Sequence, residues 1–181
     1  MNARTTLVRA AAAAAVLTTT IGLAGPAAAE TTTVIDGADT TASLSDIRRV
    51  TLAHRDTEVV VRTTFTDLRR NSAAGLRINI DTDSSRPGPE FALLSGLGDG
   101  TDYQLMRVTD WRIHGAPKTC SHQATISWAT DVYRLEVGRA CIGSPAQVRV
   151  GVRMTDHHDP SHPVTDWMSG WRRFTGWMSR G

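Results

Sequence analysis

The sequence predicts an all-β protein, a single antiparallel β-sandwich of jelly-roll or immunoglobulin-like type with about eight or nine strands. Short segments rich in Val, Ile and Thr alternate between apolar and polar residues, as strands with one buried face do. Clusters of Gly, Pro, Asn, Asp and Ser separate these segments. After residue 29, no segment keeps the apolar period of an amphipathic helix.

The clearest strand is 58–65 (EVVVRTTF), whose odd-numbered residues form one face. In 76–80 and 148–154 apolar residues alternate with arginines, which we expect on the solvent-facing side. The other predicted strands, each bounded by turn residues, are 47–53, 91–94, 103–109, 124–128, 132–137 and 171–174.

Residues 1–29 have the pattern of a secretory signal peptide. Arg4 and Arg9 accompany a mildly apolar run that ends in three alanines at 27–29, the small residues that a signal peptidase reads. The run is shorter than the roughly 20 apolar residues that a transmembrane anchor needs. We therefore expect a secreted, extracellular protein, with one domain at 30–181 that is monomeric and has no membrane span.

Removal of the signal peptide changes the charge balance. The whole chain carries 20 Lys and Arg against 18 Asp and Glu. Arg4 and Arg9 leave with the signal, so the mature domain has 18 of each and no formal net charge. Because a neutral secreted domain lacks the basic surface that nucleic-acid binding needs, nucleic acid is excluded as a partner.

The two cysteines, Cys120 and Cys141, are expected to form a disulfide in an oxidising compartment. They flank the predicted strands 124–128 and 132–137. The bridge would then join the open ends of one hairpin, which is a structural role.

A first candidate calcium site follows the predicted strand at 76–80. Asp81 and Asp83 leave the strand end, and Glu90 stands on the far side of a Pro/Gly loop. Clustered carboxylates supply the oxygen ligands that calcium prefers, although the EF-hand spacing is not met. The alternative is an Asx-turn, in which the aspartates accept hydrogen bonds from their own backbone.

A second, more loosely spaced candidate calcium set consists of Asp36, Asp39 and Asp46, which precede the predicted strand at 47–53. Plain turn chemistry is the alternative for each of them. Calcium is the only cofactor that these residues lead us to expect.

Three aromatic residues are candidate ligand contacts: Tyr103, Trp111 and Trp128. Aromatic rings stack on the apolar faces of ligands such as sugars, and the alternative is burial in the sandwich core. Three further tryptophans lie in the C-terminal tail, where we expect the last strand, with a surface for a protein partner as the alternative: Trp167, Trp171 and Trp177.

Several motifs occur in an order that resembles a known group. They are VIDG at 34–37, EVVVRTTF at 58–65, INIDTD at 78–83 and DYQL at 102–105. The chain resembles the DOMON-like and family-nine carbohydrate-binding-module β-sandwiches, and secreted actinobacterial proteins of unknown function related to them, over 34–155. The resemblance implies sugar or haem binding, often with structural calcium. The residues that match its acidic positions are Asp36, Asp81 and Asp83.

These observations predict a secreted non-enzymatic binding module, carbohydrate-binding and holding structural calcium, with a polysaccharide or an extracellular protein as partner. No nucleophile elbow, zinc-protease motif or phosphate-binding loop is present in the sequence. Two alternatives stay open: a secreted hydrolase with a carboxylate pair in a sandwich cleft, and an extracellular protein-interaction module.

Overall fold

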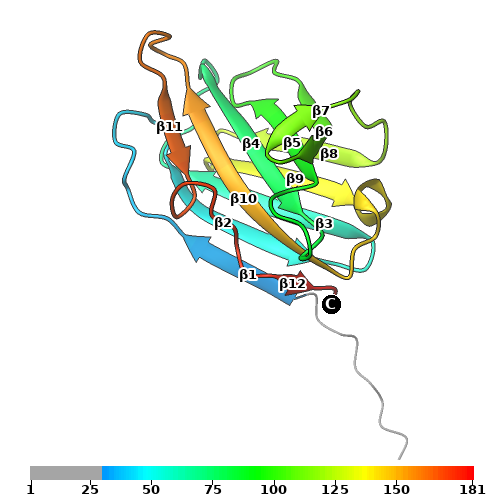
Figure 1. Cartoon of the computed structure of the whole chain (residues 1–181). Helices are drawn as coiled ribbons and strands as arrows, with labels where there is room; N and C mark the ends of the chain where they lie inside the picture. The colour runs from blue at the N-terminus through cyan, green and yellow to red at the C-terminus, as the bar shows by residue number, and fades with distance from the viewer. Residues whose placement is uncertain (1–29) are drawn as a thin grey trace, which may run out of the picture.

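The computed structural model describes residues 30–181, which form two antiparallel sheets packed face to face (Figure 1). One sheet has the strand order β1-β2-β3-β9-β8, and the other has β11-β10-β4-β5-β6-β7, with β12 also paired to β10. The predicted signal peptide lies outside the described residues. The strands are β1 Glu30–Ile35, β2 Ile47–His54, β3 Glu58–Phe65, β4 Ala74–Asp81, β5 Phe91–Gly96, β6 Tyr103–Thr109, β7 Arg112–His114, β8 His122–Ser127, β9 Val132–Gly138, β10 Gln147–Asp156, β11 Val164–Trp167 and β12 Met178–Ser179.

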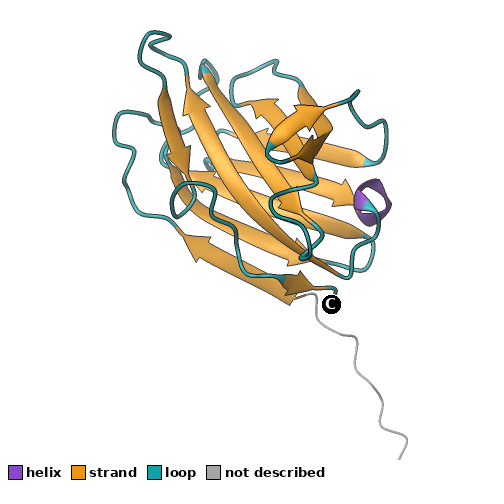
Figure 2. Ribbon diagram, viewed as in Figure 1, coloured by secondary structure: helices purple, strands orange, loops and turns teal. Residues whose placement is uncertain are grey.

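The all-β sandwich prediction is confirmed, and within 30–181 the sole helical element is the short 3-10 turn η1, Arg139–Ile142 (Figure 2). The strand count is twelve. The prediction missed β1, β7, β11 and β12, because these strands lie at sheet edges and their sequences lack a clear apolar alternation. In the described part of the chain, no helix is long and apolar enough to cross a bilayer.

The core lies between the two sheets and is built from the inward-facing residues of the central strands. Val59, Val61 and Phe65 of β3 are buried, as the alternation predicts, and they belong to the same cluster as Leu76 and Ile78 of β4. Each such side chain contributes roughly 1.5–3 kcal/mol when fully removed from water. This packing fixes which residues of each strand face outward, and the outward residues of β4 and β10 line the outer-face pocket described below.

The disulfide between Cys120 and Cys141 is confirmed. Cys120 precedes β8, and Cys141 lies in η1 directly after β9. Since β8 and β9 pair as an antiparallel hairpin, the bridge joins its open ends as expected.

The C-terminal tail runs along one edge of β10 as a strand interrupted by a loop. Arg153 pairs with Trp167 in β11, and Val148 pairs with Met178 in β12. The two paired positions are five residues apart on β10 but eleven residues apart in the tail. The six extra residues of the tail therefore form a loop away from the sheet edge. The strand predicted at 171–174 is wrong, because these residues belong to that loop.

This loop folds over the outer face of β4 and β10. Gly151 lies beneath it, where an added Cβ would stand 2.6 Å from the carbonyl oxygen of Arg173. Asn79, also on the outer face, is completely buried. Arg77 and Arg153 lie on the outward side as expected, but both are only partly exposed, because the tail and its aromatic residues cover this face.

Candidate functional site

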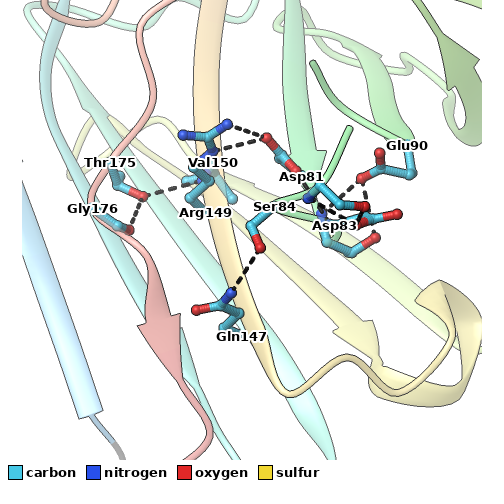
Figure 3. A network of polar contacts seen from close by, with 11 residues as sticks. Asp81, Asp83, Ser84, Glu90, Gln147, Arg149, Val150, Thr175 and Gly176 are labelled. Carbon is cyan, nitrogen blue, oxygen red and sulfur yellow. Dashed lines mark hydrogen bonds and ion pairs between the residues drawn. The ribbon is translucent and has the colours of Figure 1, made fainter. Parts of the chain in front are cut away.

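The first candidate calcium set begins with Asp81, at the end of β4, whose side chain is fully buried. Its Oδ2 accepts a hydrogen bond from Nε of Arg149 at 2.8 Å and pairs with Nη2 at 2.6 Å (Figure 3). Arg149 stands directly opposite on β10. Burial raises the pKa of Asp81, and the hydrogen bond and charge of Arg149 oppose that rise. The arginine neutralises the charge that would otherwise attract a cation.

The two other carboxylates of this set have separate partners. Asp83 Oδ1 accepts hydrogen bonds from the backbone nitrogen of Ser85 at 3.0 Å and its hydroxyl at 2.6 Å, which is the Asx-turn alternative. Glu90 Oε2 accepts one from the backbone nitrogen of Thr82 at 2.8 Å. In the described part of the chain, no group of acidic oxygens within 4.8 Å of one another contains Asp81, Asp83 and Glu90. The structure therefore does not assemble them around one point.

The second candidate set is assembled in part, with a new member. Asp39, Asp46 and Asp166 each offer a carboxylate oxygen, and these oxygens all lie within 4.8 Å of one another. Asp39 and Asp46 come from the segment between β1 and β2, and Asp166 comes from β11. Asp46 and Asp166 are only 3% and 2% exposed. Sequence reasoning missed Asp166, since nothing in the local sequence shows that the tail returns to this end of the sandwich.

Asp36 directly follows β1 and lies outside that group of three, but it is close enough for its charge to act on Asp166. Its Oδ1 accepts a hydrogen bond from the backbone nitrogen of Ser169 at 3.2 Å, just past β11. Its Oδ2 is buried and has no hydrogen-bond partner among residues 30–181, and the residue is 5% exposed. We refer to Asp36, Asp39, Asp46 and Asp166 as the four-carboxylate cluster.

The charges of the four-carboxylate cluster are poorly compensated. Burial raises the pKa of Asp166 to about 6, and the neighbouring carboxylates add to the rise, whereas a hydrogen bond from the Ile47 nitrogen opposes it. Burial likewise raises the pKa of Asp36. Among the described residues, the one ion pair made by the cluster joins Arg48 Nη1 to Asp46 Oδ2 at 3.3 Å. Asp39 is exposed and the other three carboxylates are buried, and such an oxygen-only donor set with excess negative charge fits a hard cation such as calcium.

A third group with metal-ligand chemistry contains Cys120, His122 and Cys141. Both sulfur atoms are used in the disulfide, and His122 Nδ1 lies 2.7 Å from the carbonyl oxygen of Cys120. Thiolates are the ligands that would bind zinc here, so the oxidised pair does not form a zinc site.

Two of the candidate ligand contacts, Tyr103 and Trp128, line one small cavity of about 180 Å³ between β5–β6 of one sheet and β8–β9 of the other. Trp128 Nε1 donates a hydrogen bond to the carbonyl oxygen of Leu97 at 3.2 Å. The guanidinium of Arg70 lies 4.3 Å from the centre of its ring. Both rings also pack against the core, so their position agrees with the structural alternative.

The third candidate, Trp111, is on the outer face of the seven-stranded sheet and away from that cavity. It lies in the turn between β6 and β7 and is half-buried. Its ring centre is 5.9 Å from that of Trp167 and 5.3 Å from that of Phe174. Arg172 stacks on it, with its guanidinium carbon 4.8 Å from the ring centre. We refer to Trp111, Trp167, Phe174 and Arg172 as the aromatic cluster.

Beside the aromatic cluster, the same face is hollowed into a pocket of about 340 Å³. Arg77 and Arg153 line it together with Thr155 and Gln104. From the sequence, these arginines were expected only to face solvent, with no role in a site. The register of β4 against β10, which places Arg77 opposite Arg153, is what brings them together.

Comparisons with protein-family models, with curated proteins and with solved structures each found no match. The resemblance to DOMON-like and family-nine carbohydrate-binding sandwiches therefore rests on the sequence motifs alone.

Proposed function

We propose that this protein is a secreted, non-enzymatic binding module that takes carbohydrate on the outer face of its seven-stranded sheet, at Trp111. The observation that carries the proposal is the backbone that presents this side chain. Asp110 and Trp111 form the two-residue turn between β6 and β7, with φ angles of 50° and 65°. Such turns favour Asn-Gly or Asp-Gly, because both residues have left-handed backbones.

A tryptophan in the left-handed region costs roughly 1–2 kcal/mol. Strain of this kind persists where the surroundings over-determine it, which often occurs at binding sites. Here the surroundings are Trp167 and Phe174, with Gly88 beneath the indole, where an added Cβ would stand 2.9 Å from Nε1 of Trp111. The strained turn holds a partly exposed ring in a fixed position, with Arg172 stacked on it.

A fixed, partly exposed indole offers contact area to the apolar face of a sugar ring. Aromatic rings offer large contact area with little loss of side-chain entropy. The adjacent pocket supplies hydrogen-bonding groups for sugar hydroxyls, among them Gln104 and Thr155. Carbohydrate recognition needs this combination of a stacking surface and directional polar groups.

Titration calorimetry with a panel of soluble polysaccharides tests the proposal. We expect at least one polysaccharide to bind, and Trp111→Ala to weaken its binding by about tenfold or more. Trp128→Ala is the matched control, because Trp128 lies at the other cavity, and it should leave binding unchanged. Loss of binding in Trp128→Ala but not in Trp111→Ala would place the site elsewhere, and no binding to any polysaccharide would refute the function.

The hydrolase alternative requires two carboxylates facing each other across a groove. The outer-face pocket is lined by one carboxylate, that of Asp102, which argues against this reaction there. Release of new reducing ends from a bound polysaccharide would favour the hydrolase.

The protein-interaction alternative rests on Trp171, which is 70% exposed, whereas Trp167 and Trp177 are partly buried.

We also propose that the four-carboxylate cluster holds a structural calcium ion. Asp36 Oδ2, buried and without a partner, is the observation that favours it, because a buried carboxylate oxygen without a donor is costly. The ion would tie β11 to the segment between β1 and β2. Thermal unfolding with calcium and with chelator tests this role: a higher melting temperature in calcium is expected, and identical curves would refute it.

A further inference from the structure

Part of the floor of the outer-face pocket is formed by glycine. Gly75 of β4 pairs with Gly96 of β5, and both lie among its lining residues. A Cβ added at Gly75 would make an ordinary contact, 3.7 Å from the carbonyl oxygen of Ser95, whereas one at Gly96 would stand 2.5 Å from Cγ2 of Thr101, whose side chain covers that glycine. The pocket of about 340 Å³ falls within the roughly 300–1,000 Å³ that is usual for small-ligand sites.

Two arginines on neighbouring strands form one wall of this pocket. Arg77 and Arg153 stand directly opposite each other on β4 and β10, an arrangement in which like charges repel. Neither makes an ion pair with any carboxylate of residues 30–181. Burial first, and then the charges of Arg153 and Arg172, lower the pKa of Arg77. The wall therefore carries positive charge that the protein itself does not neutralise.

The hydrogen bonds of these arginines are incomplete. Arg77 donates from Nε to Asn79 Oδ1 at 2.7 Å and from Nη2 to the carbonyl oxygen of Trp111 at 3.0 Å. The Nε of Arg153 is buried and has no acceptor, and the hydroxyl of Thr155 in the same pocket is likewise buried without a partner. Unsatisfied buried polar groups are rare, and a bound ligand is one of the things that completes them.

Opposing charge in the pocket is small. Asp102 is the single carboxylate among its lining residues, and it is exposed and accepts a hydrogen bond from the backbone nitrogen of Tyr103 at 2.8 Å. Two guanidinium groups against one solvent-exposed carboxylate leave a cationic site. Arginine is suited to carboxylates, because its planar fork of donors matches the two oxygens.

We propose that this pocket binds the carboxylate of a uronic acid unit in an acidic polysaccharide, with Arg77 and Arg153 as the groups that receive it. The inference rests on the proposed carbohydrate-binding function and names its substrate class. A sugar is favoured over other carboxylates by Trp167, which pairs with Arg153 across β10 and β11 and has its ring centre 5.7 Å from the guanidinium carbon. The aromatic cluster can stack on the sugar chain while the arginines hold its carboxylate.

The test compares polygalacturonate with its fully methyl-esterified form, which keeps the sugar backbone and removes the charge. We expect polygalacturonate to bind at least about tenfold more tightly. The advantage should fall as salt is raised, because exposed charge interactions are screened. Equal binding of both polymers would overturn this inference and leave the proposed function intact. If the protein binds no polysaccharide at all, both the inference and the proposed function are overturned.

Two variants locate the site. Arg153→Met removes a charge that makes no hydrogen bond or ion pair within residues 30–181, and Gly75→Val adds a side chain to the pocket floor. Each should abolish the preference for polygalacturonate while the protein keeps its cooperative melting. Arg62→Met is the matched control, because Arg62 is an exposed arginine on β3 of the other sheet. An unchanged preference in both pocket variants would overturn the assignment.

Two further ligands separate uronate recognition from general attraction to anions. Polyglutamate supplies carboxylates without sugar rings, and dextran sulfate supplies sugar rings with sulfate. We expect both to bind more weakly than polygalacturonate. Binding of polyglutamate as tight as that of polygalacturonate would overturn the sugar assignment, and equally tight binding of dextran sulfate would overturn the choice of carboxylate.

Discussion

The two acidic regions of this protein look alike in sequence and differ in what surrounds them. At the end of β4, Asp81 is fully buried but is bound by two nitrogens of Arg149. In the four-carboxylate cluster, Asp36 and Asp166 are almost as deeply buried and have no cationic partner within the described residues. The first region is an internal ion pair, and the second is a negative site.

The comparison teaches that the number of carboxylates in a loop does not decide whether a cation binds there. What decides is whether the fold already supplies the positive charge. In the first region the register of β4 against β10 supplies an arginine. In the second, the tail brings another aspartate into a group that holds one arginine contact, from Arg48 to Asp46.

The largest effect is expected from breaking the ion pair of the first region. Arg149→Met should lower the free energy of unfolding by about 3–5 kcal/mol, since it leaves the buried carboxylate of Asp81 uncompensated. Urea unfolding measures the loss. The double variant Asp81→Asn/Arg149→Met should recover most of it, and a loss below about 1 kcal/mol in the single variant would show that the pair is not needed.

The next largest effect is the gain from calcium in the second region. At a calcium concentration of about 100 times Kd, the free energy of unfolding should rise by about 2.7 kcal/mol. Asp166→Asn should abolish the gain, because it removes a charge at the centre of the cluster. Asp83→Asn in the first region is the control and should keep the gain. Loss of the gain in that variant would mean that the calcium ion binds in the first region and not in the second.

A smaller effect is expected for metal-free protein as pH changes. Because the folded-state pKa of Asp166 is raised from 3.8 to about 6, its protonated form favours folding below pH 4, and this stability is lost as pH rises through about 6. In chelator, Asp166→Asn should therefore be more stable than the parent at pH 7, by on the order of 1–2 kcal/mol, with a flatter pH profile. Urea titrations from pH 4 to 7 measure this. Lower stability of the variant at pH 7 would contradict the view that the four-carboxylate cluster carries uncompensated negative charge.

The smallest effect is expected at Asp83. Its carboxylate accepts bonds from Ser85 in a solvent-exposed turn, and those bonds lower its pKa. Asp83→Ala should leave the melting temperature nearly unchanged at neutral pH, both with calcium and without it. A calcium-dependent change in this variant would mean that the first region binds the ion after all.

Much of the fold could be predicted from local sequence. β3 and β6 have the predicted bounds, 58–65 and 103–109, because apolar alternation is a property of the segment itself. The disulfide followed from two cysteines flanking one hairpin. The tail could not be predicted in the same way: the loop between β11 and β12 depends on β10 as a pairing partner, and its aromatic residues suggested a strand.

The candidate sites show the same division. Sequence alone determined the acidic segment at Asp36, Asp39 and Asp46 and the Asx-turn alternative at Asp83, because short-range spacing fixes both. Only the tertiary structure decided that Asp166 joins Asp39 and Asp46, that Arg149 neutralises Asp81, and that Arg77 meets Arg153. Each of these contacts joins residues more than sixty positions apart, and the physical reason is strand register, which is set when apolar faces pack between the two sheets.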